Sequence, residues 1–353
     1  MLTVGRLPLE AQTAYAELVR ALLATRTHAD PSDGPDVDGT VVEKVIGGRT
    51  YLYLQERAMG SMRQTYLGSD TPAVRAHAEE ITRRARARRT DDDVRAVLVR
   101  VARAGGCASP TAAEQKVLET LARHRVFSVG GILVGTHAFT VLSNALGMSA
   151  SLATLRTADI DLVHDPRIMV ALDDADARPI ARMEKETVGG VRLWAVPGFD
   201  RRQPSTSFKV HGTQLQLDFL TPQRTRSDAP VELPTLGTAA LPLKYLDYLV
   251  EETGPGAVVG GAGVLVNVPD PSRFALHKLI VAELRPAVFA TQTRKDLLQS
   301  EALLRLLLTD RPRDVRDAWR ALDQRGRGWS SRARRSITKL DPLVRARLAD
   351  AIA

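Results

Sequence analysis

The feature that most restricts how this chain can fold is a pair of aspartates, Asp159 and Asp161, within the apolar segment ADIDLV. The surrounding residues predict a strand, and side chains two residues apart on a strand point to the same face. Two carboxylates on one face repel each other unless a cation lies between them. A third carboxylate, Asp218, occurs in the apolar segment QLQLDFL, where an uncompensated charge would be costly. The three aspartates together suggest a divalent-metal site.

A strand, a tight turn and a helix precede the aspartate pair. A helix is expected from Ser109, with Glu114 placed to cap it, to about His124, and the apolar strand VFSVGGILVG follows. The chain then turns at Gly135 and Thr136, and a second helix is expected to begin near His137. Small residues at a helix start allow a phosphate to approach backbone N–H groups and the positive end of the helix dipole.

The first third of the chain has a different pattern. Residues 9–27 predict an amphipathic helix, and residues 40–68 alternate apolar and polar side chains around glycine turns at 47–48 and 60–61, which predicts a small antiparallel sheet. A helix rich in arginine from Arg83 to Arg89 follows. Its arginines either pair with acidic neighbours on a solvated helix face or contact phosphate.

The last part, from about Pro271, is predicted to be helical, with a buried leucine-rich helix around residues 303–308. The glycine-rich segment VVGGAGVLVNVPDP before it predicts a tight hairpin. Trp319 and Trp329 lie near arginines, so they either pack in the core or stack on bases of a single-stranded acceptor.

Composition narrows the class of protein. The 353 residues are 44% hydrophobic and 25% charged, which indicates a globular chain of two or three domains and excludes a disordered or fibrous one. Since no long apolar run or secretory pattern occurs, we expect a cytoplasmic protein without a membrane association. The single cysteine, Cys107, excludes an internal disulfide and a cysteine-based zinc site. A net charge of +8, carried mainly by arginine, is compatible with nucleotide or nucleic-acid binding.

The set of a Gly-Thr turn before a helix, Asp-x-Asp on a strand and a single Asp on a later strand resembles the nucleotidyltransferase superfamily that includes DNA polymerase beta. The resemblance covers about residues 110–300. With Arg156 just before the aspartate pair, the spacing is most similar to a bacterial branch related to the nucleotidyltransferase toxins of toxin–antitoxin systems. The segment RFALHKLIVAELRPAVFATQTRKDLL offers basic residues and a basic-acidic pair at similar spacing, at Lys278, Arg285 and Lys295 with Asp296.

The resemblance implies a mechanism. Two Mg²⁺ or Mn²⁺ ions would be bound by Asp159, Asp161 and Asp218, and an NTP would be attacked at its alpha phosphorus with release of pyrophosphate. Asp218 would accept the proton of the attacking hydroxyl. The nucleotide would be bound by residues that the resemblance places at the turn, just before the aspartate pair and on the later helix, namely Gly135, Thr136, Arg156, Lys278 and Arg285.

Several of these residues also have a purely structural interpretation. Lys278 has apolar neighbours and would then extend its ammonium group to the surface. Asp296 would pair with Lys295 or cap a turn. His137 and His277 would be hydrogen-bonded structural histidines rather than catalytic ones.

We therefore predict a mixed α/β fold. Residues 1–105 form a helix, hairpin and basic-helix region, residues 106–270 a nucleotidyltransferase domain with a palm-like mixed sheet, and residues 271–353 a helical domain. The predicted function is metal-dependent transfer of NMP from an NTP to an acceptor hydroxyl, with RNA or a tRNA end favoured over a protein or a small hydroxylated molecule. The alternative is an inactive nucleotide- or RNA-binding module that acts as a partner in a toxin–antitoxin or defence assembly.

Overall fold

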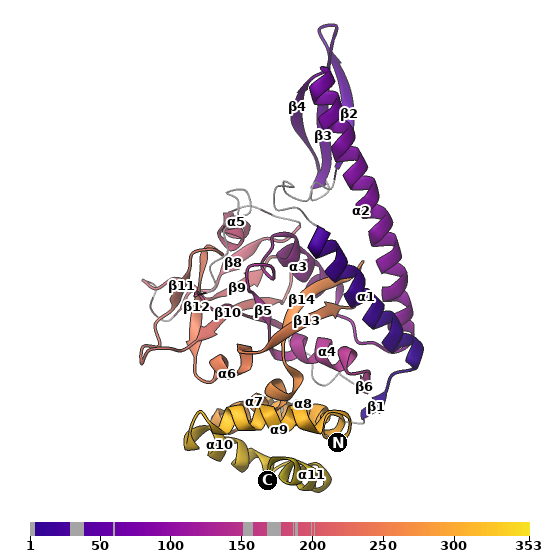
Figure 1. The fold of residues 1–353 in the computed structure, drawn as a ribbon. Coiled ribbons are helices and arrows are strands. Elements are labelled where there is room, and N and C mark those ends of the chain that lie inside the picture. Colours follow the sequence, from indigo (N-terminus) through magenta and orange to yellow (C-terminus); the bar gives the residue numbers. More distant parts are fainter. Residues whose placement is uncertain are drawn as a thin grey trace.

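The structure is a computed structural model that describes residues 4–28, 39–58, 61–150, 158–167, 178–185, 187, 190–198, 200 and 202–353. Its described part has the mixed α/β fold predicted from the sequence (Figure 1). A seven-stranded sheet lies at the centre, an arm projects from one side, and a stack of helices covers another side.

The arm consists of a three-stranded antiparallel sheet packed on a long helix. Its elements are β2 (Gly39–Ile46), β3 (Arg49–Ala58), β4 (Ser61–Ser69) and α2 (Pro72–Ala104). Leu52 and Leu54 are buried, while the side chains that alternate with them on β3 are partly exposed. The β2–β3 turn uses Gly47 and Gly48 with positive φ, as predicted. On α2, Arg83 and Arg84 pair with Glu80 rather than standing as unpaired cations.

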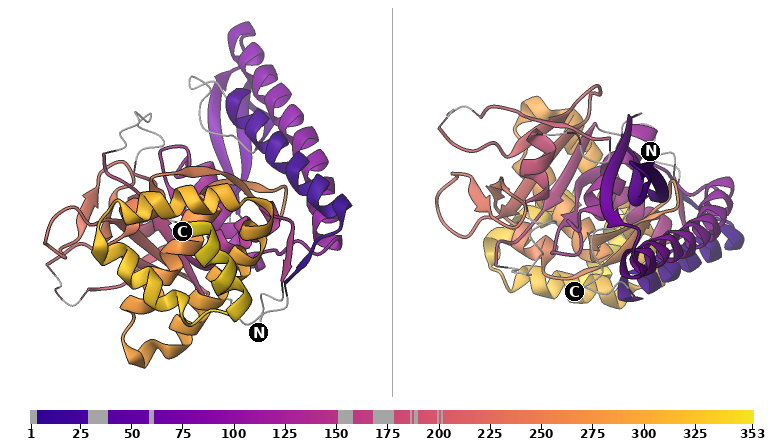
Figure 2. Two further views of the ribbon diagram at one scale, coloured as in Figure 1. Left: turned by 60° about the horizontal axis from the view of Figure 1, so that its bottom comes forward. Right: turned by 90° about the horizontal axis from the view of Figure 1, so that it is seen from above.

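The arm is joined to the body through α1 (Leu9–His28), which runs beside α2 in both Figures 1 and 2. A small apolar core under α1 includes Leu18 and the buried Cys107. The Tyr15 hydroxyl accepts a hydrogen bond from Ala257 N at 3.1 Å and donates to Val141 O at 3.3 Å. These contacts fix the base of the arm against the body.

The central sheet has the strand order β11-β12-β10-β7-β5, with β9 paired to β10 and β8 paired to β9. β10 is parallel to β7 and to β12, and the other pairs are antiparallel. The strands are β5 (Ile132–Leu133), β7 (Asp159–Val163), β8 (Leu193–Ala195), β9 (Ser207–Val210), β10 (Gln216–Pro222), β11 (Val231–Leu233) and β12 (Thr238–Leu243).

Shorter elements surround this sheet. The helices are α3 (Ala112–Arg123), α4 (Gly135–Ala145), α5 (Pro179–Lys185) and α6 (Leu246–Val250), and two strand pairs are β1 (Val4–Arg6) with β6 (Met148–Ala150) and β13 (Thr253–Val258) with β14 (Val264–Pro269). The β13–β14 pair is the hairpin predicted from the glycine-rich segment.

Three local predictions between residues 109 and 137 need correction. α3 is capped by Thr111, not Ser109, because Thr111 and Glu114 form a reciprocal capping box. The expected strand from 126 to 135 is reduced to Ile132–Leu133, since the preceding residues form successive turns. α4 begins at Gly135 rather than near His137.

The C-terminal helices form a layer that lies below the sheet in Figure 1 and in front of it in the left view of Figure 2. They are α7 (Pro271–Leu284), the 3₁₀ helix η2 (Ala287–Phe289), α8 (Ala290–Asp310), α9 (Pro312–Asp323), α10 (Arg327–Ile337) and α11 (Pro342–Ile352). The leucines of α8 join the main core, as predicted. Trp319 is buried, and Trp329 packs edge-on against Tyr245, so core packing is the correct interpretation of both tryptophans.

Candidate active site

The three predicted aspartates lie on one face of the central sheet. The parallel register of β7 and β10 places Asp161 opposite Asp218 and Asp159 opposite Gln216. Ile160, between the two β7 aspartates, is fully buried on the other face. Residues opposite each other on adjacent strands are neighbours on the same face. We call this side of the sheet the carboxylate face.

The carboxylate face is electrostatically strained. Burial raises the pKa of Asp161 to about 6, and the negative charge of Asp218 adds to the increase. Burial and Asp218 likewise raise the pKa of Asp159 above its ordinary value. Like charges close together favour protonation unless a cation compensates them. This face therefore has the charge that a bound cation would neutralise.

Gly135 fits the carboxylate face because it lacks a side chain. The Val134 N–H donates to Asp161 O at 3.0 Å, which holds the start of α4 against β7. Gly135 has φ +64°, and a Cβ there would lie 2.1 Å from Asp161 Oδ2. Glycine is required both for the left-handed backbone and for the approach of Asp161. The N-terminal end of α4 thus faces the aspartates.

Gln216 was missed by the sequence interpretation. Its Nε2 donates to both carboxylate oxygens of Asp218, at 2.9 and 3.2 Å, and so fixes the direction of that carboxylate. The signal was available: Gln216 precedes Asp218 by two residues and therefore shares its strand face.

Carboxylates gathered on one face imply a bound metal ion, and the residues present show whether they suit one. In the described ranges, no group of three or more His, Cys, Asp or Glu side chains forms a ready-made metal site. The donor type nevertheless suits Mg²⁺ or Mn²⁺, because carboxylate oxygens are their preferred ligands. Asp159, Asp161 and Asp218 fit such an ion by chemistry and by shared face.

Basic side chains of the C-terminal helices face the aspartates. Lys278 and Arg285 line the same cleft as Asp161 and Asp218. Both donate to Asp296 of α8: Lys278 Nζ at 2.7 Å and Arg285 Nε at 2.5 Å. Lys278 is therefore not a surface lysine, and Asp296 pairs with these two residues rather than with Lys295.

Asp296 is charged although it is buried. Burial opposes ionisation of Asp296, but Lys278 and Arg285 outweigh it and hold the pKa of Asp296 below its ordinary value. Burial first, and then the charge of Lys278, lowers the pKa of Lys295 to about 8. Asp161 and Asp159 act on Lys295 in the opposite direction, which places this lysine within electrostatic reach of the carboxylate face.

The lining of the cleft is partly charged and partly apolar. Its charged side chains are Asp161, Asp218, Lys278 and Arg285, and Gly135 also lines it. Apolar side chains from β10, β12, α6 and α7 line it as well: Leu220, Leu241, Leu243, Leu246, Leu249 and Val281. Leu241 and Leu243 are more than a third exposed, so these two side chains are accessible to a ligand.

The remaining predicted residues are placed differently. Thr136 lines a separate small pocket together with Ser109 and Asn144, not the carboxylate cleft. Arg156 lies outside the described residues. His277 is buried beside Lys278, and burial lowers its pKa to about 3, so it is neutral. His137 lies 3.9 Å from Glu114 on the side of Thr136.

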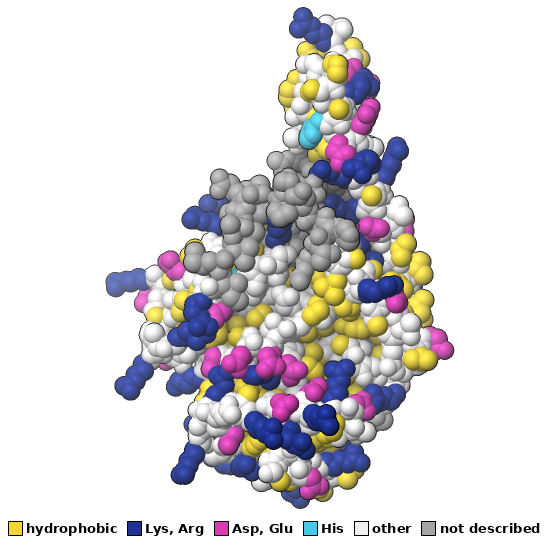
Figure 3. Space-filling model, viewed as in Figure 1, with side chains coloured by type: hydrophobic (Ala, Val, Ile, Leu, Met, Phe, Trp, Pro, Cys, Tyr) yellow, Lys and Arg dark blue, Asp and Glu magenta, His cyan; other side chains and the backbone are white. Residues whose placement is uncertain are grey.

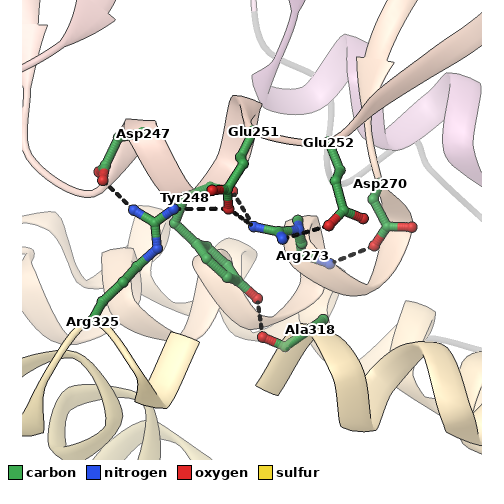
Figure 4. Close-up of polar contacts among 8 residues, drawn as sticks. All are labelled: Asp247, Tyr248, Glu251, Glu252, Asp270, Arg273, Ala318 and Arg325. Carbon is green, nitrogen blue, oxygen red and sulfur yellow. Dashed lines mark hydrogen bonds and ion pairs between the residues drawn. The ribbon is translucent and has the colours of Figure 1, made fainter. Parts of the chain in front are cut away.

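A polar network around the buried Arg273 holds α7 in place (Figure 4). Asp270 caps α7 by accepting from the Ser272 and Arg273 N–H groups. The Arg273 guanidinium donates to Tyr248 O at 3.1 Å and to Glu251 and Glu252 at 2.6 Å each. Arg273, near the N-terminus of α7, therefore connects α7 to α6 and to the two residues that follow α6.

The same network reaches the C-terminal helices. Arg325 pairs with Asp247 and with Glu251, and the Tyr248 hydroxyl donates to Ala318 O at 2.9 Å (Figure 4). Since Lys278 and Arg285 belong to α7 or follow it directly, this network also fixes their position above the carboxylate face.

The fold and the site define the class. A small mixed sheet that presents carboxylates from two parallel neighbouring strands beside a glycine-initiated helix is the arrangement of a nucleotidyltransferase fold. A nucleotidyltransferase family model matches residues 113–323, more than half of the chain, and the chain belongs to this family. The match runs from α3 to α9 and contains every described residue of the carboxylate cleft.

Two further comparisons add no relative: no curated protein and no solved structure matches the chain. In the described part of the chain, no helix has the length and apolar character needed to cross a membrane.

Proposed function

We propose that this protein transfers a nucleoside monophosphate from an NTP to an acceptor hydroxyl and requires Mg²⁺ or Mn²⁺. The observation that carries the proposal is the register of Asp161 opposite Asp218, with Gly135 held against Asp161. Asp159, Asp161 and Asp218 would hold the cation. When bound, it would supply the positive charge that the triphosphate and the attacking oxygen need.

The residues of the cleft have distinct roles in this proposal. Gly135 and the N-terminal N–H groups of α4 receive the terminal phosphates, since a helix N-terminus favours anions. Lys278 and Lys295 add positive charge near them, and Arg285 helps to hold Asp296 against Lys278. The apolar side chains of the cleft receive the base of the NTP.

In the transfer step, the acceptor oxygen attacks the alpha phosphorus of the NTP. A new phosphorus–oxygen bond forms, the bond to the bridging oxygen of the beta phosphate breaks, and pyrophosphate leaves. Asp218 takes the proton of the acceptor hydroxyl, and Gln216 orients Asp218 for this task.

We propose RNA as the acceptor, on the basis of charge. The net charge is +8, and Lys and Arg side chains spread over the arm, the body and the C-terminal helices on the face shown in Figure 3. Such a surface attracts polyanions. The relation to toxin–antitoxin nucleotidyltransferases and the identity of the acceptor both stay predictions.

The test is a transfer assay with each alpha-labelled NTP, Mg²⁺ or Mn²⁺, and total RNA or a protein extract as acceptor. We expect label in RNA with the unmodified chain and none with the Asp159→Asn/Asp161→Asn double variant. Asp317→Asn, an exposed aspartate paired with Arg320 on α9, is the matched control and should retain transfer. Label in protein instead of RNA would show that the acceptor is a protein.

A second outcome would change the class of function. Nucleotide binding that depends on Mg²⁺, without transfer to any acceptor, would favour the alternative of a nucleotide-binding module. Isothermal titration with a non-hydrolysable NTP analogue distinguishes this case from complete loss of the site.

A further inference from the structure

The β8–β9 hairpin has a solvent-facing side that the proposed transfer chemistry does not use. Its inward residues Leu193, Phe208 and Val210 are buried in the main core. The residues that alternate with them are all exposed, namely Arg192, Trp194, Lys209 and His211. We call these four residues the hairpin platform.

Trp194 is the exposed tryptophan of the chain. Its side chain is 55% exposed, whereas Trp319 is buried and Trp329 packs against Tyr245 and Tyr248. Tryptophan is on average a highly buried residue, because its large ring gains much from burial. An exposed tryptophan is therefore a candidate contact for a ligand.

The Trp194 ring has an aromatic and a cationic neighbour on the platform. Trp194 stacks on His211 with a centroid separation of 5.9 Å and an interplanar angle of 16°. The Arg192 guanidinium lies 5.8 Å from the centre of the Trp194 ring. A hydrogen bond of 2.9 Å from His211 N to Arg192 O joins the two strands beside it. The aromatic surface is thus flanked by positive charge.

The strand registers connect this platform to the aspartates. Trp194 is opposite Lys209 on β9, Lys209 is opposite Gln216 on β10, and Gln216 is opposite Asp159 on β7. These residues form one row across four adjacent strands, so Trp194 and Lys209 lie on the carboxylate face. The three strands can be followed side by side in Figure 1 as β8, β9 and β10.

The length of this row determines which part of the substrate it can reach. Three strand spacings of about 4.8 Å separate Trp194 from Asp159 by about 14 Å. The alpha phosphorus of the NTP must lie at the aspartates, and its base is covalently close to that phosphorus. In stacked polynucleotide, about 14 Å corresponds to about four nucleotide steps of about 3.4 Å. The platform is therefore within reach of an acceptor strand whose reacting end lies at the aspartates.

We propose that the hairpin platform binds an unpaired base of a single-stranded RNA acceptor, about four nucleotides from its reacting end. The base stacks on Trp194, and Arg192 and Lys209 contact the neighbouring phosphates. Aromatic rings with adjacent cations bind single strands in this way, because every base has a face that can stack. The proposal rests on the proposed transferase function and adds the position of its acceptor.

The first experiment measures binding without catalysis. Fluorescence anisotropy with labelled single-stranded RNA of two and of six nucleotides is compared for the unmodified chain, Trp194→Ala, Trp194→Phe and Phe289→Ala. Phe289 is an exposed aromatic of η2 that belongs to neither site and serves as the matched control. We expect Trp194→Ala to weaken binding of the six-nucleotide RNA roughly 5- to 100-fold, and Trp194→Phe to restore most of it.

Two internal comparisons make the result specific. The two-nucleotide RNA is too short to contact the platform and the aspartates together, so Trp194→Ala should weaken its binding less than that of the six-nucleotide RNA. Affinity for the NTP with Mg²⁺ should be unchanged, because Trp194 lies outside the cleft. Equal weakening for both RNA lengths, or a parallel loss of NTP affinity, would overturn the proposal, as would the absence of RNA binding at low salt.

The transfer assay separates this proposal from the proposed function. If RNA is labelled but Trp194→Ala shows the same dependence on acceptor length as the unmodified chain, the platform is refuted and the transferase stands. If no label moves while Trp194→Ala still loses binding of the longer RNA, the platform stands as an RNA-binding surface and the transferase function fails.

Discussion

Replacing Gly135 with alanine tests the contact on which the candidate site depends. An alanine at φ +64° would cost about 1–2 kcal/mol in backbone strain. Its Cβ would also lie 2.1 Å from Asp161 Oδ2, so the carboxylate must retreat by about 1.3 Å to reach an ordinary contact of 3.4 Å. Forcing atoms into a packed site adds about 1–3 kcal/mol. We expect the free energy of unfolding to fall by about 2–5 kcal/mol.

The displacement of Asp161 should affect the site more than the fold. A catalytic group misplaced by about 1 Å lowers rates about 100-fold. We therefore expect Gly135→Ala to lower the rate of NMP transfer by about two orders of magnitude and to weaken binding of Mn²⁺ with an NTP. Transfer is measured with alpha-labelled NTP, and binding by isothermal titration, at a temperature where both proteins are folded.

Gly47→Ala is the control for the backbone contribution. Gly47 has φ +59°, and nothing lies within 4 Å of the position its Cβ would take. It should lose about 1–2 kcal/mol of stability in the arm and retain transfer and NTP binding. If Gly135→Ala lost no more activity than Gly47→Ala, the inferred contact between Gly135 and Asp161 would have no role in the site, and our reasoning would be wrong.

Three further perturbations address the rest of the site. Because the pKa of Asp161 is raised to about 6, Mn²⁺ must compete with a proton for this carboxylate below that pH. The affinity of the site for Mn²⁺ should therefore fall as the pH drops from 7 to 5. Calorimetric titrations in buffers of different ionisation enthalpy should detect proton release on Mn²⁺ binding near pH 6 but little at pH 7.5. Asp296→Asn leaves Lys278 without its buried carboxylate and should lower the free energy of unfolding, measured by urea denaturation, by about 3–5 kcal/mol. Asp317→Asn removes one partner of an exposed ion pair and should lower it by at most about 1 kcal/mol. Equal losses in the two variants would contradict the role of burial. Tyr248→Phe removes the hydrogen bond to Ala318 O and should cost about 0.5–1.5 kcal/mol, and an unchanged unfolding midpoint would show that the bond adds no stability.

Local sequence signals are strong in the arm and in the β13–β14 hairpin. The β2–β3 turn at Gly47 and Gly48, the α2 helix and the β13–β14 hairpin were predicted because glycine pairs and alternating side chains specify local geometry. Segment 126–135 was mispredicted as one strand, since apolar composition alone does not distinguish a strand from the buried turns that precede Ile132.

For the site, the sequence determined which residue types are present and which share a face. Asp159 and Asp161 share a face because of strand alternation alone. What only the tertiary structure decided is that β7 and β10 are parallel neighbours in a register that places Asp161 opposite Asp218. A shift of that register by one residue would turn Asp218 to the other face, and no local pattern in either strand determines it.

The partners of the charged residues were decided in the same way. The sequence places Lys295 next to Asp296, yet adjacent residues on a helix do not face each other, so Asp296 pairs with Lys278 and Arg285 instead. The sequence by itself thus determined the family, the carboxylates and the positions of most helices. Packing determined which distant residues meet, because contacts between elements depend on the whole core and not on any one segment.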